Sequence, residues 1–188
     1  MTDPSDKPLG KDAVSAALVE AAIELIVNEG THVSVRQVAA AAGVNHGLVH
    51  TYFGSKEALL AAAFDEINRR ASADLDSAGF PPVDLARRRG GELGKAIARM
   101  RLDEMGDSFS SHPVTSSWRD ALAATRPDLD SDEIDTMVVT ASTLALGWAV
   151  FGDQLCDTVG LEGDRRAEME RHVVELYAEI GGIPDPPE

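Results

Sequence analysis

The sequence predicts an all-α protein with an N-terminal head of three helices and a C-terminal helical bundle. Apolar residues recur at the spacing of one helix face along most of the chain, and no segment alternates as a half-buried strand does. Aromatic residues make up only 5% of the chain, so alanine, leucine and valine carry the packing. That composition favours helix over strand.

The head, residues 12–55, follows a lead-in of residues 1–11 that we expect to be disordered. Its first helix is predicted over residues 12–29, where seven apolar side chains follow one helix face. Gly30 comes directly after this stripe and supplies a stop signal. The first element of the head is therefore a single amphipathic helix.

Two short helices separated by a tight turn complete the head. The run Ser34-Val-Arg-Gln matches a capping box, which begins a helix over residues 34–42. Gly43 ends that helix in a left-handed conformation, and Asn45 caps a third helix over residues 45–53. Two short helices joined by a glycine turn have the spacing of a helix-turn-helix.

The body, residues 56–182, contains the remaining helices, and residues 183–188 form a frayed tail. A helix over residues 55–77, capped by Ser55, leads into it, and the segment Ala78-Gly-Phe-Pro-Pro82 interrupts the chain. Further helices are predicted over residues 84–105, 114–125, 131–155 and 165–180. No repeat of 20–50 residues is visible.

Charge is distributed unevenly along the chain. With 17 Lys and Arg against 32 Asp and Glu, the net charge is −15, which taken alone argues against a nucleic-acid partner. The segment from Gly30 to Lys56, however, contains no acidic residue, and it holds Arg36 and three histidines. Because phosphate binding depends on local charge, this segment is a candidate surface for a polyanion.

The cellular compartment follows from three observations. Cys156 is the one cysteine, which excludes an intrachain disulfide framework and favours a reducing cytosol. The N-terminus lacks the apolar core of a signal peptide. The longest charge-free apolar stretch, residues 136–152, is 17 residues long and reads better as a buried helix than as a membrane span. We expect a soluble cytoplasmic protein.

The run Ala22–Leu59, with VSVRQVAAAAGVNHGLVHTYFGSKEALL at its centre, resembles the TetR (tetracycline-repressor-like) family of transcriptional regulators. The resemblance covers about the first 65 residues; the rest shares only the family's all-helical plan. It implies a sequence-specific DNA-binding regulator, typically a repressor that a small-molecule ligand releases. It also implies a homodimer that binds a double-stranded DNA operator, with the body serving ligand binding and dimerisation.

Carried over position by position, the resemblance assigns roles to residues of the head. His46, Gly47, Leu48 and His50 fall where the family's recognition helix meets base edges, and Arg36 is a further candidate for a base contact. Asn45 begins this helix. The phosphate-contacting positions are Ser34, Thr51, Tyr52 and Lys56.

Two departures from the family pattern affect the expected affinity. His50 stands where a tyrosine is usual, and no arginine or lysine lies within residues 45–53. Lys56 therefore carries most of the phosphate affinity at this end of the site. We expect modest DNA affinity with a shallow salt dependence.

The predicted 131–155 helix, begun by a capping pair of Asp130 and Glu133, is apolar nearly all round, and we expect it to be buried. With the 165–180 helix it is a candidate for a four-helix dimer interface, which the resemblance implies. The candidate interface residues are Ser142, Leu146, Val150, Val173, Leu176 and Tyr177. Periodicity alone equally allows these stripes to form the core of a single chain.

A ligand pocket is expected in the body, because methionine and aromatic side chains suit adaptable apolar cavities. The candidates are Met100, Met105, Phe109, Trp118, Met137, Trp148 and Phe151. Each of them is also typical of ordinary core packing.

Other functions find little support in the sequence. His112, His172 and Cys156 include no pair at metal-ligand spacing, and no hydrolase, phosphate-loop or dinucleotide motif is present, so we expect neither a metal site, a cofactor nor an enzyme. Two alternatives remain open. The first is a helical ligand- or protein-binding module whose helix-turn-helix no longer reads DNA, which the net charge of −15 and the recognition helix without lysine or arginine favour. The second, less favoured, is a helical enzyme, which a pocket with convergent acid and base groups would support.

Overall fold

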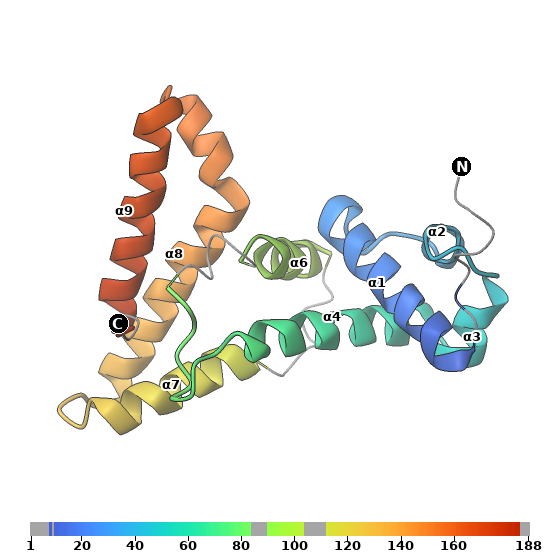
Figure 1. The fold of residues 1–188 in the computed structure, drawn as a ribbon, viewed down its shortest axis with the longest axis horizontal. Coiled ribbons are helices and arrows are strands. Elements are labelled where there is room, and N and C mark those ends of the chain that lie inside the picture. Colours follow the sequence, from blue (N-terminus) through green and yellow to red (C-terminus); the bar gives the residue numbers. More distant parts are fainter. Residues whose placement is uncertain (1–7, 9, 84–89, 104–111, 185–188) are drawn as a thin grey trace. The chain divides into compact units, whose positions relative to one another are not determined.

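A computed structural model describes residues 8, 10–83, 90–103 and 112–184. The described residues form eight α-helices and no strand, as predicted (Figure 1). The helices are α1 (Lys11–Glu29), α2 (Val35–Ala41), α3 (Gly47–Phe53), α4 (Lys56–Ala73), α6 (Gly90–Leu102), α7 (Pro113–Thr125), α8 (Ser131–Thr158) and α9 (Gly163–Gly181). The start of the predicted 84–105 helix, most of the lead-in and residues 185–188 of the tail lie outside the described residues.

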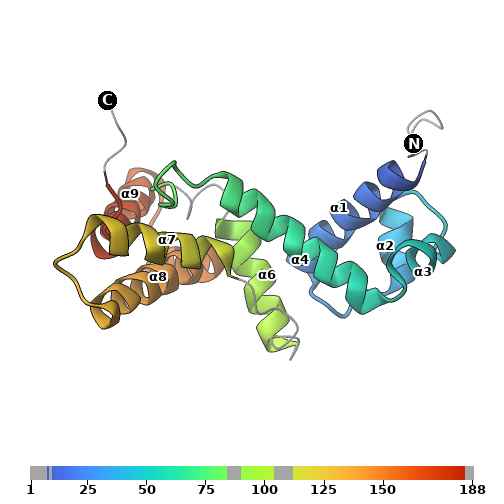
Figure 2. The same cartoon turned by 90° about the horizontal axis from the view of Figure 1, so that it is seen from below.

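The chain divides into two compact units. Unit 1 comprises Met1–Ile67 and Ala96–Ser110, and unit 2 comprises Asn68–Lys95 and Ser111–Glu188. Two helices, α4 and α6, therefore contribute residues to both units (Figure 2). The division predicted from the sequence is a different one: it separates a DNA-binding head that ends at residue 55 from a body that binds ligand and dimerises. That division stays a prediction.

Unit 1 is built around the packing of α1, α2 and α3 on one another. Leu18 and Ile26 of α1, Val38 of α2 and Val49 of α3 are fully buried in this core. Ala39 is buried as well, and its small side chain permits the close approach of helices that a helix-turn-helix requires. The apolar stripes of the sequence thus pack one short helix against the next.

The turn between α2 and α3 has the conformation that the sequence predicts. Gly43 has φ +67°, in the left-handed region that favours glycine. The N–H of Val44 donates to the carbonyl of Ala39 at 2.9 Å, and the N–H of Gly43 donates to that of Ala40 at 3.1 Å. This pair of bonds is a Schellman motif, which satisfies the last carbonyls of α2 and redirects the chain into α3.

Side-chain hydrogen bonds lie at the starts of three helices, α2, α3 and α4. The capping box at α2 is confirmed: the Gln37 N–H donates to Ser34 Oγ at 3.2 Å, and the Ser34 N–H donates to Gln37 Oε1 at 2.9 Å. Asn45 Oδ1 accepts from the Gly47 N–H at 2.8 Å, although α3 itself begins two residues later than predicted. Ser55 caps α4 as expected, accepting from the N–H of residue 58 at 3.1 Å.

Unit 2 has an aromatic core between α7, α8 and α9. The rings of Trp118 and Tyr177 meet edge to face with centroids 5.6 Å apart. The Trp118 indole N–H donates to the carbonyl of Gly181 at 3.0 Å, which satisfies its buried polar atom. Burial raises the pKa of Tyr177 well above its ordinary value. Leu122 of α7 and Ala141 of α8 complete the contact.

Helix α8 differs from its prediction. Its capping box of Asp130 and Glu133 is present and its thiol, Cys156, is buried, but the helix is not buried all round. By length and composition it is the one described helix that could cross a membrane, and only 22% of its most apolar window is buried. The expectation of a buried helix is therefore wrong for much of α8, because within the described residues the core reaches only part of its circumference.

Candidate nucleic-acid interface

The structure places the predicted DNA-contacting residues on an accessible surface of unit 1. None of the ten is buried: seven are exposed, and Leu48, Tyr52 and Lys56 are partly covered. The exposed seven are Ser34, Arg36, Asn45, His46, Gly47, His50 and Thr51. Because Val49 is fully buried between them, α3 turns one face to the core and leaves the opposite face to solvent.

Hydrogen bonds within this surface limit what its polar groups can offer. The Thr51 hydroxyl donates to the carbonyl of Gly47 at 3.1 Å. The Ser34 hydroxyl accepts from the Gln37 N–H at 3.2 Å and donates to Gln37 Oε1 at 2.8 Å, which leaves it less free for a phosphate. His50 Nδ1 lies 3.2 Å from the carbonyl oxygen of Gly54, so its Nε2 is the nitrogen left for an external partner.

Three acidic side chains border this surface. Glu29 Oε2 accepts from Gln37 Nε2 at 3.4 Å. Glu57 follows Lys56 directly, and its pKa is lowered by hydrogen bonds from its own backbone and from Ser55, so it stays ionised. In space, Asp103 also lies close to the acid-free segment, with its Oδ1 3.2 Å from Nε2 of His32. Sequence reasoning missed Asp103, because nothing in the sequence pairs two residues so far apart.

The described ligand-pocket candidates are divided between the two units, and their assignment to a pocket stays a prediction. Met100 is buried in unit 1, while the other described candidates belong to unit 2. Trp118 fills the core, Met137 packs on its edge, and the Trp148 ring lies over Gly152. Phe151 is 58% exposed. Met105 and Phe109 lie outside the described residues.

The predicted dimer-interface residues divide between two environments. Val173 and Tyr177 are buried in the chain's own core, which contradicts their assignment to the interface. The reason is that periodicity shows which side of α9 is apolar, but not whether that side meets the chain's own core or a second subunit. Ser142, Leu146, Val150 and Leu176 are half-buried, and Leu146 lies against Gly94 of α6.

A different part of the α8 surface is more exposed than the predicted interface. Phe151 and Leu155 lie in the last turns of α8, and Val159 is the residue directly after its end. They follow one another at four-residue spacing, and each is more than half exposed. We call these three residues the α8 apolar stripe. The sequence shows their periodicity, but it gives no sign that they lie outside the core.

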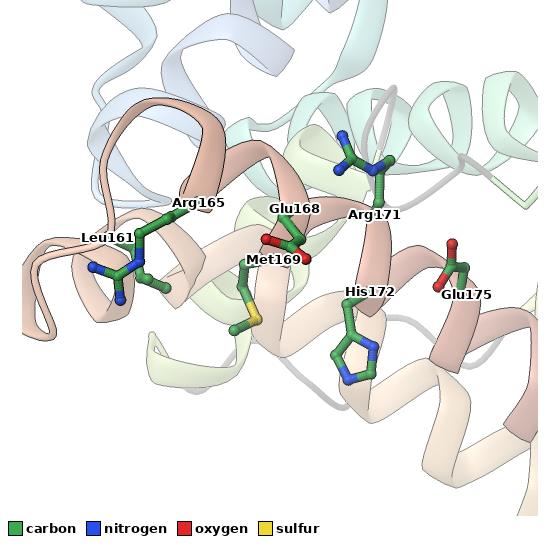
Figure 3. Close-up of a pocket in the computed structure, with 7 residues that line it drawn as sticks. All are labelled: Leu161, Arg165, Glu168, Met169, Arg171, His172 and Glu175. Atoms are coloured by element: carbon green, nitrogen blue, oxygen red, sulfur yellow. The ribbon is translucent and has the colours of Figure 1, made fainter.

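Helix α9 adds a surface groove of about 480 Å³ (Figure 3). It is lined by Leu161, Arg165, Glu168, Met169, Arg171, His172 and Glu175. Charges of both signs point from one side of the same helix, and two apolar side chains lie among them. Groups of three or more His, Cys, Asp or Glu that could hold a metal ion are absent from the described part of the chain.

An exposed, acid-poor helix-turn-helix on a helical core defines a DNA-binding protein of the regulator class. The family model for bacterial regulatory proteins of the tetR family matches residues 18–63. The HTH-type transcriptional repressor Rv3405c of Mycobacterium tuberculosis is 32% identical to this chain over 184 residues, covering 95% of each. The chain belongs to the TetR family of DNA-binding transcriptional regulators.

More distant comparisons agree on the fold. The regulator EthR of Mycolicibacterium smegmatis is 33% identical over 115 residues, which is 60% of this chain and 48% of that protein. A putative TetR-family regulator from a Rhodococcus species has a TM-score of 0.60 at 23% identity, over 89% of this chain and 98% of that one. A TetR-family regulator from Streptomyces coelicolor has a TM-score of 0.56 at 22% identity, over 92% and 82%.

Proposed function

We propose that this regulator is a cytoplasmic homodimeric repressor that reads a DNA operator through α3 and that a small ligand bound in unit 2 releases it. The observation that carries the proposal is that none of the recognition positions around the buried Val49 is itself buried. A two-fold dimer places its two recognition helices in successive major grooves, about 34–36 Å apart.

The contacts divide into those that read bases and those that hold phosphates. His46, His50 and Arg36 supply hydrogen-bonding groups for base edges, with Gly47 and Leu48 allowing close approach. Lys56 is the main phosphate contact, assisted by Thr51 and Tyr52. Since no lysine or arginine lies within residues 45–53, base readout by α3 itself depends on histidine.

The dimer forms through the α8–α9 hairpin, whose helices pack side by side (Figure 1). The α8 apolar stripe leaves three large side chains unpaired in the single chain, which a second copy covers. This proposal replaces Val173 and Tyr177 in the interface with Phe151, Leu155 and Val159. An isologous contact uses the same residues from both subunits.

The regulatory step is a shift between two arrangements of the dimer. A ligand that prefers the arrangement with wrongly spaced recognition helices weakens DNA binding by its differential affinity for the two states. Helix α4 suits the role of a lever, because it belongs in part to both units and Lys56 lies in its first turn. Met137 and Trp148, half-buried in unit 2, remain candidates to line the ligand site.

Selection of bound duplexes from a random-sequence library tests the proposal, followed by titrations of the selected duplex at low and physiological salt. His46→Ala should change sequence preference, whereas Lys56→Ala should weaken all sequences alike. Failure to enrich any sequence would favour the alternative of a helical module that no longer reads DNA.

A further inference from the structure

The turn between α1 and α2 is held by a carboxylate from the end of α6. Thr31 donates to Asp103 Oδ2 twice, through its backbone N–H at 2.9 Å and through its hydroxyl. The other oxygen, Oδ1, lies 3.2 Å from His32 Nε2. Asp103 is 72 residues from Thr31 in sequence, and both belong to unit 1.

Because Thr31 and Asp103 are largely buried, these bonds stabilise the turn more than a contact on the surface would. Thr31 is 3% exposed, and the Asp103 side chain is 15% exposed. A buried hydroxyl and N–H without partners are costly, and Asp103 satisfies both. His32 contributes less, because its side chain is 86% exposed and solvent screens its charge.

The turn itself is shaped to accept α6. Gly30 has φ +95°, and a Cβ built on it would lie 3.5 Å from both Arg99 Cδ and Asp103 Oδ2. The end of α6 therefore packs directly on the turn. The Thr31 hydroxyl and N–H also lower the pKa of Asp103, so the carboxylate remains charged at neutral pH.

The turn leads at once into the DNA-binding surface. Val33 is buried two residues after Thr31, and Ser34 is the cap from which α2 starts. Helix α2 carries Arg36 and packs against α3, the recognition helix. The position of the turn therefore sets where both helices begin.

We infer that Asp103 is a positioning residue for DNA binding, which clamps the α1–α2 turn and so holds α2 and α3 in the arrangement that fits DNA. The inference rests on the proposed function of the α2–α3 surface. It links the end of α6, a helix that also contributes residues to unit 2, to the affinity of the head. Asp103 acts through Thr31 and not by touching DNA.

Two substitutions of Asp103 separate the clamp from simple electrostatics. Asp103→Asn and Asp103→Ala both remove one negative charge from a DNA-binding unit, which by charge alone tightens DNA binding equally. The asparagine keeps an oxygen that can accept both Thr31 bonds, whereas the alanine keeps none. The clamp therefore predicts weaker binding by Asp103→Ala than by Asp103→Asn.

The test measures fluorescence anisotropy of a labelled duplex that the unaltered protein selects from a random library, with helicity checked for each variant. If loss of the clamp leaves the head competent about one-tenth of the time, the Kd rises about tenfold for Asp103→Ala and for Thr31→Val. The Kd should stay within about twofold of the unaltered protein's value for Asp103→Asn, for Thr31→Ser and for the control His32→Ala. The double variant Asp103→Ala with Thr31→Val should bind the duplex no more weakly than either single variant.

Two results overturn the inference: Asp103→Ala binding the duplex as tightly as Asp103→Asn, or Thr31→Val binding as tightly as Thr31→Ser. Since Thr31→Val leaves all charges in place, it decides the matter even if Asp103→Ala does not fold. A library from which no duplex is selected contradicts the proposed function instead. Hydrogen exchange at the Thr31 amide, which needs no DNA, then still reports whether Asp103 protects it.

Discussion

Replacing Leu155 with glutamate should dissociate the proposed dimer. Leu155 is the middle residue of the α8 apolar stripe, between Phe151 and Val159, and 57% of it is exposed in the single chain. A partner subunit that covers the stripe must bury this side chain. A carboxylate placed there would be buried opposite apolar groups of the other subunit without a cation to pair with it.

The size of the effect follows from the exposed fraction. Full burial of a leucine side chain stabilises by about 1.5–3 kcal/mol, so a side chain 57% exposed has about 1–1.5 kcal/mol left to gain from a partner. A two-fold interface contains the residue twice, which doubles the loss to about 2–3 kcal/mol. At about 1.4 kcal/mol per factor of ten, the dimer Kd rises about 100-fold, and desolvation of the carboxylates adds to it.

Sedimentation equilibrium over a concentration series measures this Kd directly. Val139→Glu is the matched control, since Val139 is also an exposed apolar residue of α8. At about 100° per residue, it lies about 160° around the helix from Leu155. The control should leave the Kd within about twofold. A dimer that survives Leu155→Glu but dissociates with Val139→Glu would show that the interface lies on another face of α8.

Three further predictions concern single residues. Gly181→Ala should lower the free energy of unfolding by about 1–3 kcal/mol in urea titrations, since a methyl group there overlaps the buried Trp118 of α7. Gly147→Ala is the control: it has open space around it and should raise the free energy of unfolding by about 0.5–1 kcal/mol. In the dimer, Lys56→Ala should reduce the slope of log K against log salt by about 2, one unit for each subunit, and an unchanged slope would remove Lys56 from the phosphate contacts. Thr31→Val should raise the pKa of Asp103 toward its ordinary value in carboxyl NMR titrations, because the Thr31 hydroxyl bond lowers that pKa in the folded protein. The stability that this bond gives the folded protein is fully present above about pH 4 and is lost as the pH falls below that value.

Local features of the fold could be predicted because local chemistry determines them. The capping box at Ser34, the left-handed Gly43 and the capping pair of Asp130 and Glu133 each involve residues within a few positions of one another. Such bonds form in a short segment whatever the rest of the chain does. The sequence therefore locates α2, the turn and the start of α8 to within a residue or two.

Long-range features could not be predicted in the same way. The bond between Thr31 and Asp103 joins residues 72 positions apart, and no pattern in either segment points to the other. The apolar periodicity of α8 and α9 is real, but periodicity does not say which face meets the core of the same chain. For that reason the sequence predicts Tyr177 at a dimer interface although it packs on Trp118, and it does not single out Leu155, which is exposed.

The central claim is that α3 enters the major groove of a duplex as one half of a symmetric pair. Methylation protection of guanine N7 atoms on the selected duplex tests it most directly, because N7 faces the major groove. We predict two protected patches related by a dyad, with centres about 10–10.5 base pairs apart or a multiple of that spacing. A single protected patch, or duplex binding that leaves every major-groove N7 reactive, would contradict it.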